Sequence, residues 1–124
     1  MAQLTWIPRA LGAATAVYGA AITVRPLLMA KPTGLVDPSG TPKPGVAALT
    51  RSIGVRDVAT GLAMAFAPAG APLRAAIAVR VASDTADAIT FGTGLPEAGS
   101  RRNSAGVAGA WAVLCALSAF AAGR

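Results

Sequence analysis

The stretch NSAGVAGAWAVLCALSAFAAG, residues 103–123, runs for 21 positions without a charged side chain. At about 1.5 Å per residue, a helix of this length spans about 31 Å, which matches the hydrocarbon thickness of about 30 Å in a bilayer. Arg102 and Arg124 bound the stretch on either side. This pattern predicts a transmembrane helix at residues 103–123. In this helix we expect Trp111 and Phe120 to fill gaps between helices or to contact lipid.

The composition of the whole chain agrees with a lipid environment. Hydrophobic residues make up 54% of the 124 positions and the mean hydropathy is +0.57, whereas ordinary soluble domains are about 45–50% apolar. Charged residues make up 13%, against about 25% in a typical soluble protein. A water-facing surface would have to be built largely from Ala, Gly, Ser and Thr, so a bilayer is the expected partner.

The charge pattern excludes several kinds of function. The net charge is +6, but the Lys and Arg residues are dispersed and only Arg101 and Arg102 are adjacent, so no basic stripe predicts a nucleic-acid partner. The sequence has no histidine, the commonest metal ligand, and its one cysteine, Cys115, lies in an apolar run. It contains no glycine-rich phosphate loop and no serine-triad motif. We therefore expect no nucleic acid, no metal and no cofactor.

A second apolar segment, ALGAATAVYGAAITV at residues 10–24, lies between Arg9 and Arg25. Its 15 residues can cross the hydrocarbon core if both arginines extend toward the head groups, and Trp6 suits an interfacial anchor. A cleaved signal peptide is the alternative interpretation of this segment. Against it, no Lys or Arg precedes Trp6, as the n-region of a signal peptide requires.

Prolines divide the rest of the chain. Residues 26–44 contain five prolines and predict a loop, Pro68 and Pro72 mark a second break, and PEAGSRRN at 96–103 is a short polar connection. The predicted fold is all-α, a four-helix transmembrane bundle formed by a single domain, residues 1–124. Its helices are expected at about residues 6–25, 45–67, 73–95 and 103–123.

The two middle helices carry charges within apolar sequence. In the helix expected at 73–95, Arg80, Asp84 and Asp87 project within about 60° of one another at 100° per residue. One face of this helix is therefore polar, and its other faces consist mainly of Ala, Val, Ile and Phe.

The helix expected at 45–67 has a matching stripe. Gly54, Asp57 and Gly61 fall within a similar arc, whereas Arg56 points about 100° away from Asp57. Glycines in a membrane helix let a neighbouring helix approach closely. We therefore expect a close helix contact around the Asp57 carboxylate.

These charges are expected to face the bundle interior, because an unpaired charge at the bilayer centre costs about 2.5–3.5 kcal/mol on insertion scales. Arg80 and Asp84 form an i,i+4 pair. Asp57 and Arg56 can reach across to the next helix. The cluster is either an ion-pair network that fixes helix register, or the wall of a pocket in which Asp84 and Asp87 share a proton and act as acid and base.

The spacing Arg51-x-x-Gly54-x-Arg56-Asp57-x-x-x-Gly61, followed by Arg80-x-x-x-Asp84-x-x-Asp87, resembles a family of small bacterial and fungal four-helix membrane proteins classed as a domain of unknown function. The resemblance covers most of the chain. It implies an integral membrane bundle whose shared signature is the Arg-Asp segment and the later aspartates. It implies no established reaction. The candidate binding residues are the arginines of these motifs: Arg51, Arg56 and Arg80.

The first functional hypothesis is a structural or accessory membrane protein, either a homo-oligomer or a partner in a larger membrane complex. The alternative is a membrane-embedded enzyme that isomerises, cyclises or opens an epoxide on a lipophilic substrate. Its candidate catalytic residues are Asp57, Asp84 and Asp87, with Arg56 or Arg80 steadying an oxyanion. A proton-coupled carrier ranks third, since four short helices without an inverted repeat make a small transporter.

The expected location is a bacterial plasma membrane, crossed several times. Positive charges are more frequent in the loops between the first and second and between the third and fourth helices than on the opposite side. These loops carry Arg25, Lys31, Lys43, Arg101 and Arg102, and the opposite side carries Arg9, Arg74 and Arg124. Because cytoplasmic loops are enriched in Lys and Arg, this distribution predicts that both termini lie outside.

Overall fold

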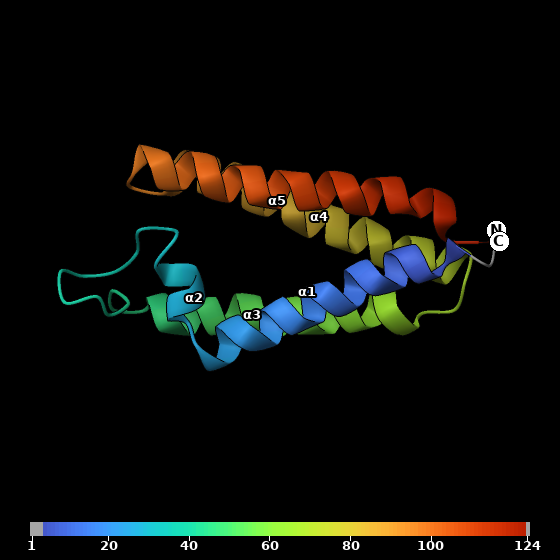
Figure 1. Cartoon of the computed structure of the whole chain (residues 1–124), viewed down its shortest axis with the longest axis horizontal. Helices are drawn as coiled ribbons and strands as arrows, with labels where there is room; N and C mark the ends of the chain where they lie inside the picture. Colours follow the sequence, from blue (N-terminus) through green and yellow to red (C-terminus); the bar gives the residue numbers. More distant parts are fainter. Residues whose placement is uncertain (1–3, 124) are drawn as a thin grey trace.

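The computed structural model describes residues 4–123, and this part of the chain is all-α (Figure 1). Its elements are α1 (Trp6–Val24), α2 (Leu27–Ala30), α3 (Val46–Phe66), α4 (Ala71–Gly94), α5 (Ala98–Ser118) and the short 3-10 turn η2 (Ala119–Ala121). Four of the helices are long, as the sequence predicted. The start of α1, the α3–α4 connection and η2 lie together at what we call the terminal end; α2 and residues 31–45 lie at the opposite, loop end.

The predicted loop at residues 26–44 contains one short helix. Pro26 precedes α2, where its fixed φ angle and missing N–H are tolerated at the start of a helix. Pro32 follows α2 almost at once and cannot continue the helical hydrogen bonds. The sequence did not predict α2, because four residues between two prolines carry no periodic signal.

The fourth long helix begins earlier than predicted. α5 starts at Ala98 and not at residue 103, so Arg101 and Arg102 lie in its first turns and not in a connection. Only residues 95–97 separate α4 from α5. The absence of charge marks where a helix becomes apolar enough for lipid, whereas the helix itself begins earlier, at Ala98, and includes two charged arginines.

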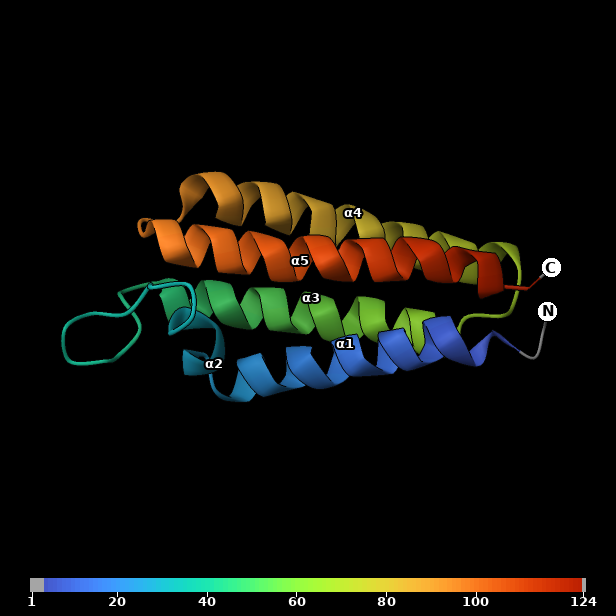
Figure 2. The same ribbon diagram turned by 45° about the horizontal axis from the view of Figure 1, so that its top comes forward.

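The long helices pack as two antiparallel pairs, α1 with α3 and α4 with α5 (Figure 2). The α1/α3 contact is made by four buried glycines, Gly12 and Gly19 of α1 and Gly54 and Gly61 of α3. A Cβ atom placed on Gly61 would lie 2.5 Å from the Gly12 carbonyl oxygen, and one on Gly19 would lie 2.5 Å from the Gly54 carbonyl oxygen. The two backbones therefore touch, and the close neighbour expected from Gly54 and Gly61 is α1.

The hydrophobic core lies at the terminal end. Its buried members come from α3, α4, α5 and the residues after η2: Met64, Leu73, Ile77, Cys115 and Ala122. Leu11 of α1 and Trp111 of α5 are partly buried against this core. The two helix pairs are thus joined by close apolar packing at one end of the bundle.

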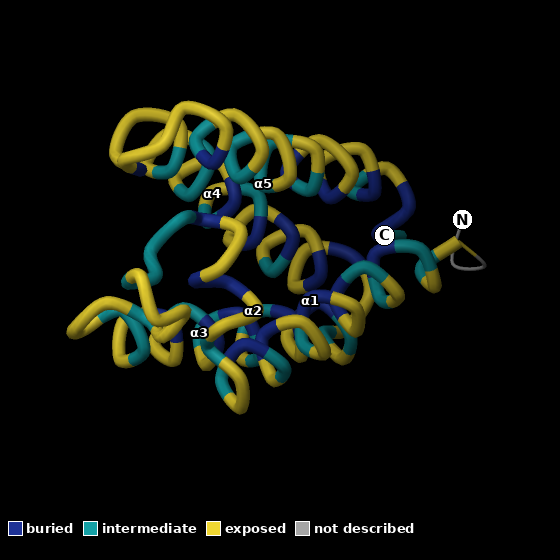
Figure 3. Tube along the Cα trace, turned by 60° about the vertical axis from the view of Figure 1, so that its left-hand side comes forward, coloured by how far each residue is buried: buried dark blue, intermediate teal, exposed yellow. Residues whose placement is uncertain are grey.

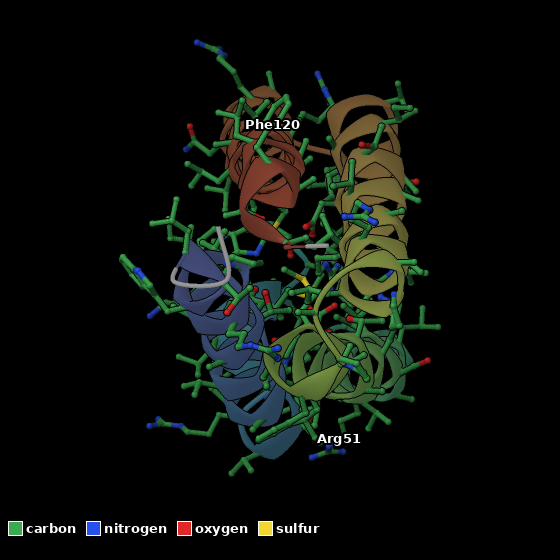
Figure 4. The ribbon with its side chains drawn as sticks, turned by 90° about the vertical axis from the view of Figure 1, so that its right-hand side faces the viewer. Arg51 and Phe120 are labelled. Carbon is green, nitrogen blue, oxygen red and sulfur yellow. The ribbon has the colours of Figure 1, made fainter. Side chains whose placement is uncertain are left out.

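The outward faces of the long helices are apolar. Exposed residues cover the outside of both pairs, whereas buried ones face the interior (Figure 3). Large exposed hydrophobic side chains occur on every long helix and on η2, among them Val17, Phe66, Val79, Ile89, Val107 and Phe120. Phe120 is 82% exposed and projects from the end of the α4/α5 pair (Figure 4).

Two of the described helices are long and apolar enough to cross a membrane, Trp6–Val24 and Ala98–Ala121. α3 and α4 are as long, but each contains several charged side chains. Hydropathy alone therefore identifies two candidate membrane-spanning helices. The other two helices would have to place their charges against protein.

Candidate functional site

Arg80 of α4 is the centre of a buried ion-pair cluster between α3 and α4. Its side chain is 1% exposed. Nε and Nη2 donate to the two carboxylate oxygens of Asp84, at 3.0 and 2.9 Å. Nη1 donates to Asp57 Oδ1 and to Thr60 Oγ1, both at 2.8 Å. The guanidinium thus joins a carboxylate on its own helix to a carboxylate on α3.

A second arginine extends the cluster toward the surface. Arg56 Nη2 donates to Asp87 Oδ2 at 2.7 Å, and Arg56 Nη1 donates to Asp87 Oδ1 at 3.3 Å. Arg56 Nη2 also lies 3.2 Å from Asp57 Oδ1, so this one oxygen accepts hydrogen bonds from both arginines. We call these five residues, Arg56, Asp57, Arg80, Asp84 and Asp87, the Arg/Asp cluster.

The cluster confirms the predicted polar contact between the two middle long helices. The i,i+4 pair between Arg80 and Asp84 is present, and both Asp57 and Arg56 reach across to α4. Both arginines come from helices whose opposite faces are apolar. Each guanidinium bonds two carboxylates, which satisfies its charge without water.

A cavity of about 380 Å³ lies between the two helix pairs, beside the cluster. Asp57, Arg80, Asp84 and Asp87 form its charged wall. Its apolar lining comes from all five helices and includes Met29, Ile53, Phe91, Val107 and Trp111. The cavity extends from the middle of the bundle toward the loop end, where Pro32 and Thr33 border it. The core occupies the opposite end.

The sequence did not predict the cavity residues contributed by α1 and α5. Trp111 Nε1 donates to Thr15 Oγ1 at 2.9 Å, which connects α5 to α1 across the cavity. Tyr18, Asn103 and Ser104 also border the cavity, and their side chains make no hydrogen bond within residues 4–123. A signal was available, because positions 104, 108 and 111 share one face of a helix.

Arg51 does not join the cluster. It is exposed and lies on the outer edge of the α1/α3 pair (Figure 4). Its Nε donates to the Thr23 carbonyl oxygen at 3.1 Å, near the C-terminus of α1, where carbonyl groups lack helical partners and a positive charge is favourable. Arg51 lies six positions before Asp57, about 9 Å away along the helix axis and about 120° around it, whereas Arg56 is adjacent to Asp57 and reaches the cluster from its edge.

Within residues 4–123, no group of three or more His, Cys, Asp or Glu side chains is placed to hold a metal ion. The three cluster aspartates are instead held by guanidinium groups. Cys115 is buried in the core. The chemistry of the cavity therefore depends on carboxylates, guanidiniums and neutral hydrogen-bonding groups.

No family model, curated protein or solved structure matches the chain. The function is therefore inferred from the geometry of the cavity and from the distribution of polar and apolar side chains.

Proposed function

We propose that the chain is a small multi-pass membrane protein that binds a lipophilic small molecule in the cavity between its helix pairs. The resemblance to the four-helix membrane family of unknown function is part of this proposal. The observation that carries it is the cavity of about 380 Å³, which has charged residues on one side and mainly apolar residues, with a few neutral polar ones, on the others.

The membrane location is supported by the arrangement of charge. Large apolar side chains face outward on every long helix, while Arg80, Asp84 and Asp57 are buried. In water, so continuous an apolar exterior would be an aggregation hazard. In lipid, the same arrangement is expected, since charged side chains there turn toward the bundle interior and pair. The loop end carries Arg25, Lys31, Lys43, Arg101 and Arg102, which supports a cytoplasmic orientation of this end in the proposed bacterial plasma membrane.

A binding role is supported by the contrast between the cavity and ordinary packing. Protein interiors are close-packed and contain few voids larger than a water molecule. The cavity volume is within the range of about 300–1,000 Å³ typical of small-molecule sites, which combine apolar walls with a few polar groups. A bundle that needed only to hold its helices together would gain stability by filling this space.

The outer edge of the cavity supports a ligand that arrives through lipid. Tyr18 of α1 and Val107 of α5 both line the cavity, yet they are 49% and 73% exposed on the surface. The cavity therefore reaches the outside between α1 and α5. In a bilayer this opening would face the hydrocarbon region, from which a lipophilic molecule can enter sideways.

Acid/base catalysis is the second candidate, because Asp84 and Asp87 both border the cavity. Each of them accepts two hydrogen bonds from a guanidinium, Asp84 from Arg80 and Asp87 from Arg56. This geometry suits two carboxylates better than an acid and a base. It favours binding and orientation of a ligand over proton transfer.

The proposed function is tested by filling the cavity. Ala108 borders it, whereas Ala110 of the same helix is exposed and does not. Wild-type protein, Ala108→Phe and the control Ala110→Phe are purified from membranes in mild detergent, and native mass spectrometry measures bound small molecules. We expect a bound mass in wild type and in Ala110→Phe, and its loss in Ala108→Phe. Equal occupancy in all three, or none in wild type, would contradict the proposal.

A further inference from the structure

The charged groups of the cavity wall do not balance. The Arg/Asp cluster holds three carboxylates and two guanidiniums, and no other Asp, Glu, Lys or Arg borders the cavity within residues 4–123. With all five groups ionised, the cluster carries one negative charge more than it can neutralise. An uncompensated charge in a low-dielectric interior is relieved by protonation or by a positive partner, and the paired guanidinium contacts of Asp84 and Asp87 favour a positive partner.

The spare acceptor can be located. Both arginines bond Asp57 through Oδ1, and within residues 4–123 no donor bonds Oδ2. Asp57 is only 5% exposed. No fully buried side-chain oxygen or nitrogen in this part of the chain lacks a partner, so Oδ2 must contact accessible space. Asp57 borders the cavity, and we infer that the cavity supplies that space.

The neutral groups around the cavity offer further hydrogen bonds. Tyr18, Asn103 and Ser104 border it and have no side-chain hydrogen bond within residues 4–123. An ammonium group has several N–H donors, and the hydroxyl and amide oxygens of these residues can accept them. The rest of the cavity wall is apolar and suits a hydrocarbon body.

We propose that the molecule bound in the cavity is a lipophilic amine, whose ammonium group lies against Asp57 Oδ2 and whose apolar body fills the space lined by Ile53, Phe91 and Val107. This inference rests on the proposed function, since it names the chemical class of the ligand. The two guanidiniums hold Asp57 in place through Oδ1 and leave Oδ2 for the ligand. An alcohol with the same hydrocarbon chain would fill the cavity without neutralising the surplus negative charge of the Arg/Asp cluster.

The test compares three probes of matched chain length on the full chain in dodecyl maltoside micelles at pH 7: octylamine, octanol and octanoate. The amine is protonated at this pH, as lysine is. Trp6→Phe leaves Trp111, which borders the cavity, as the single tryptophan, and its fluorescence reports binding. Ala108→Phe in the same background corrects for probe that dissolves in the micelle.

We expect octylamine to bind about tenfold or more tightly than octanol, because hydrogen bonds to charged groups are stronger than neutral ones, and octanoate not to bind. Asp57→Asn should weaken octylamine binding by about tenfold and leave octanol binding unchanged. The order of affinities for the three probes is measured on wild-type cluster residues, so this part of the test does not depend on whether Asp57→Asn folds. Equal binding of octylamine and octanol, or tightest binding of octanoate, would overturn the amine assignment while leaving the cavity as a site for lipophiles. If no probe binds, both proposals fail.

Discussion

The bundle has two different seams, one inside the α1/α3 pair and one between the two pairs. Inside the pair, four glycines bring two backbones into contact and leave no room for a methyl group. Between the pairs, the apolar core packs closely at the terminal end, a cavity bordered by ion pairs lies between the middle of the bundle and the loop end, and Gly34 packs against Glu97 and Ser100 beyond it. One seam is closed along its length, and the other encloses a cavity.

This contrast shows how a protein with few large core side chains can be both stable and hollow. Small residues let α1 and α3 form a rigid unit through backbone contact, which in lipid is a principal source of helix association. The second seam then does not have to be filled everywhere. Directional ion pairs hold α3 and α4 in register while leaving space beside them.

The largest effect is expected where the seam between the pairs depends on one side chain. Arg80→Met should destabilise the protein by about 3–5 kcal/mol, because it leaves Asp57 and Asp84 buried without their main counter-charge. The measurement is reversible unfolding in mixed micelles. The control Arg102→Met removes an exposed arginine and should change stability by less than about 0.5 kcal/mol. A loss below about 1 kcal/mol for Arg80→Met would show that the cluster does not hold the pairs together.

The seam inside the α1/α3 pair should tolerate no added atom. Gly61→Ala would place a methyl group 2.5 Å from the Gly12 carbonyl oxygen and should destabilise the protein by about 1–3 kcal/mol. Gly106→Ala, on α5 with no atom within 4 Å of the new methyl, should stabilise it by about 0.5–1 kcal/mol. The same unfolding assay measures the stability of both variants. The same sign for the two variants would mean that the glycine contact is not close.

A smaller effect is expected at the boundary between core and cavity. Trp111→Phe removes the hydrogen bond from Nε1 to Thr15 Oγ1 and should cost about 0.5–1.5 kcal/mol. Thr15→Ala removes the acceptor, and the double variant should lose less than the sum of the single losses, because the two residues are coupled. If the two losses of unfolding free energy were strictly additive, a direct contact between Thr15 of α1 and Trp111 of α5 would be ruled out.

The smallest effect lies in the loop, outside both seams. The hydroxyl groups of Ser39 and Thr41 donate to the Asp37 carboxylate and lower the pKa of Asp37 to about 2. Because the folded pKa lies below the ordinary value, the contribution of this turn is present above that value and is lost as the pH falls toward 2. Ser39→Ala should raise the pKa of Asp37 toward its ordinary value in an NMR titration, with only a small loss of stability at pH 7, because the carboxylate is exposed to solvent. An unchanged midpoint would show that Ser39 does not bond the carboxylate.

The local parts of this arrangement could be predicted from the sequence. Helical periodicity aligned Arg80, Asp84 and Asp87 on one face, and the cost of a charge in lipid implied that the face points inward. Arg51 lies about 9 Å from Asp57 along the helix axis, so its separation from the cluster could also be predicted. Its inclusion among the binding residues followed the motif and not this distance.

The non-local parts could not be predicted in the same way. Gly54 and Gly61 indicate that some helix approaches α3, but nothing in α3 identifies α1 as that helix. The cavity depends on how the two helix pairs pack against each other, and the sequence of a single helix does not predict this packing. Asn103 and Ser104, the polar residues of α5 that border the cavity, were included in the predicted helix, but their proximity to the cavity depends on how α5 packs against the other pair.

The account as a whole requires that lipid, and not water, surrounds the bundle, and membrane fractionation tests this requirement directly. Cells producing the full chain are broken without detergent, and the membranes are washed with alkaline carbonate, which removes peripheral proteins. We predict that the protein stays in the membrane pellet and is released only by detergent. Recovery of a monodisperse protein in the detergent-free supernatant would contradict the account, because the apolar exterior and the inward charges would then need another explanation.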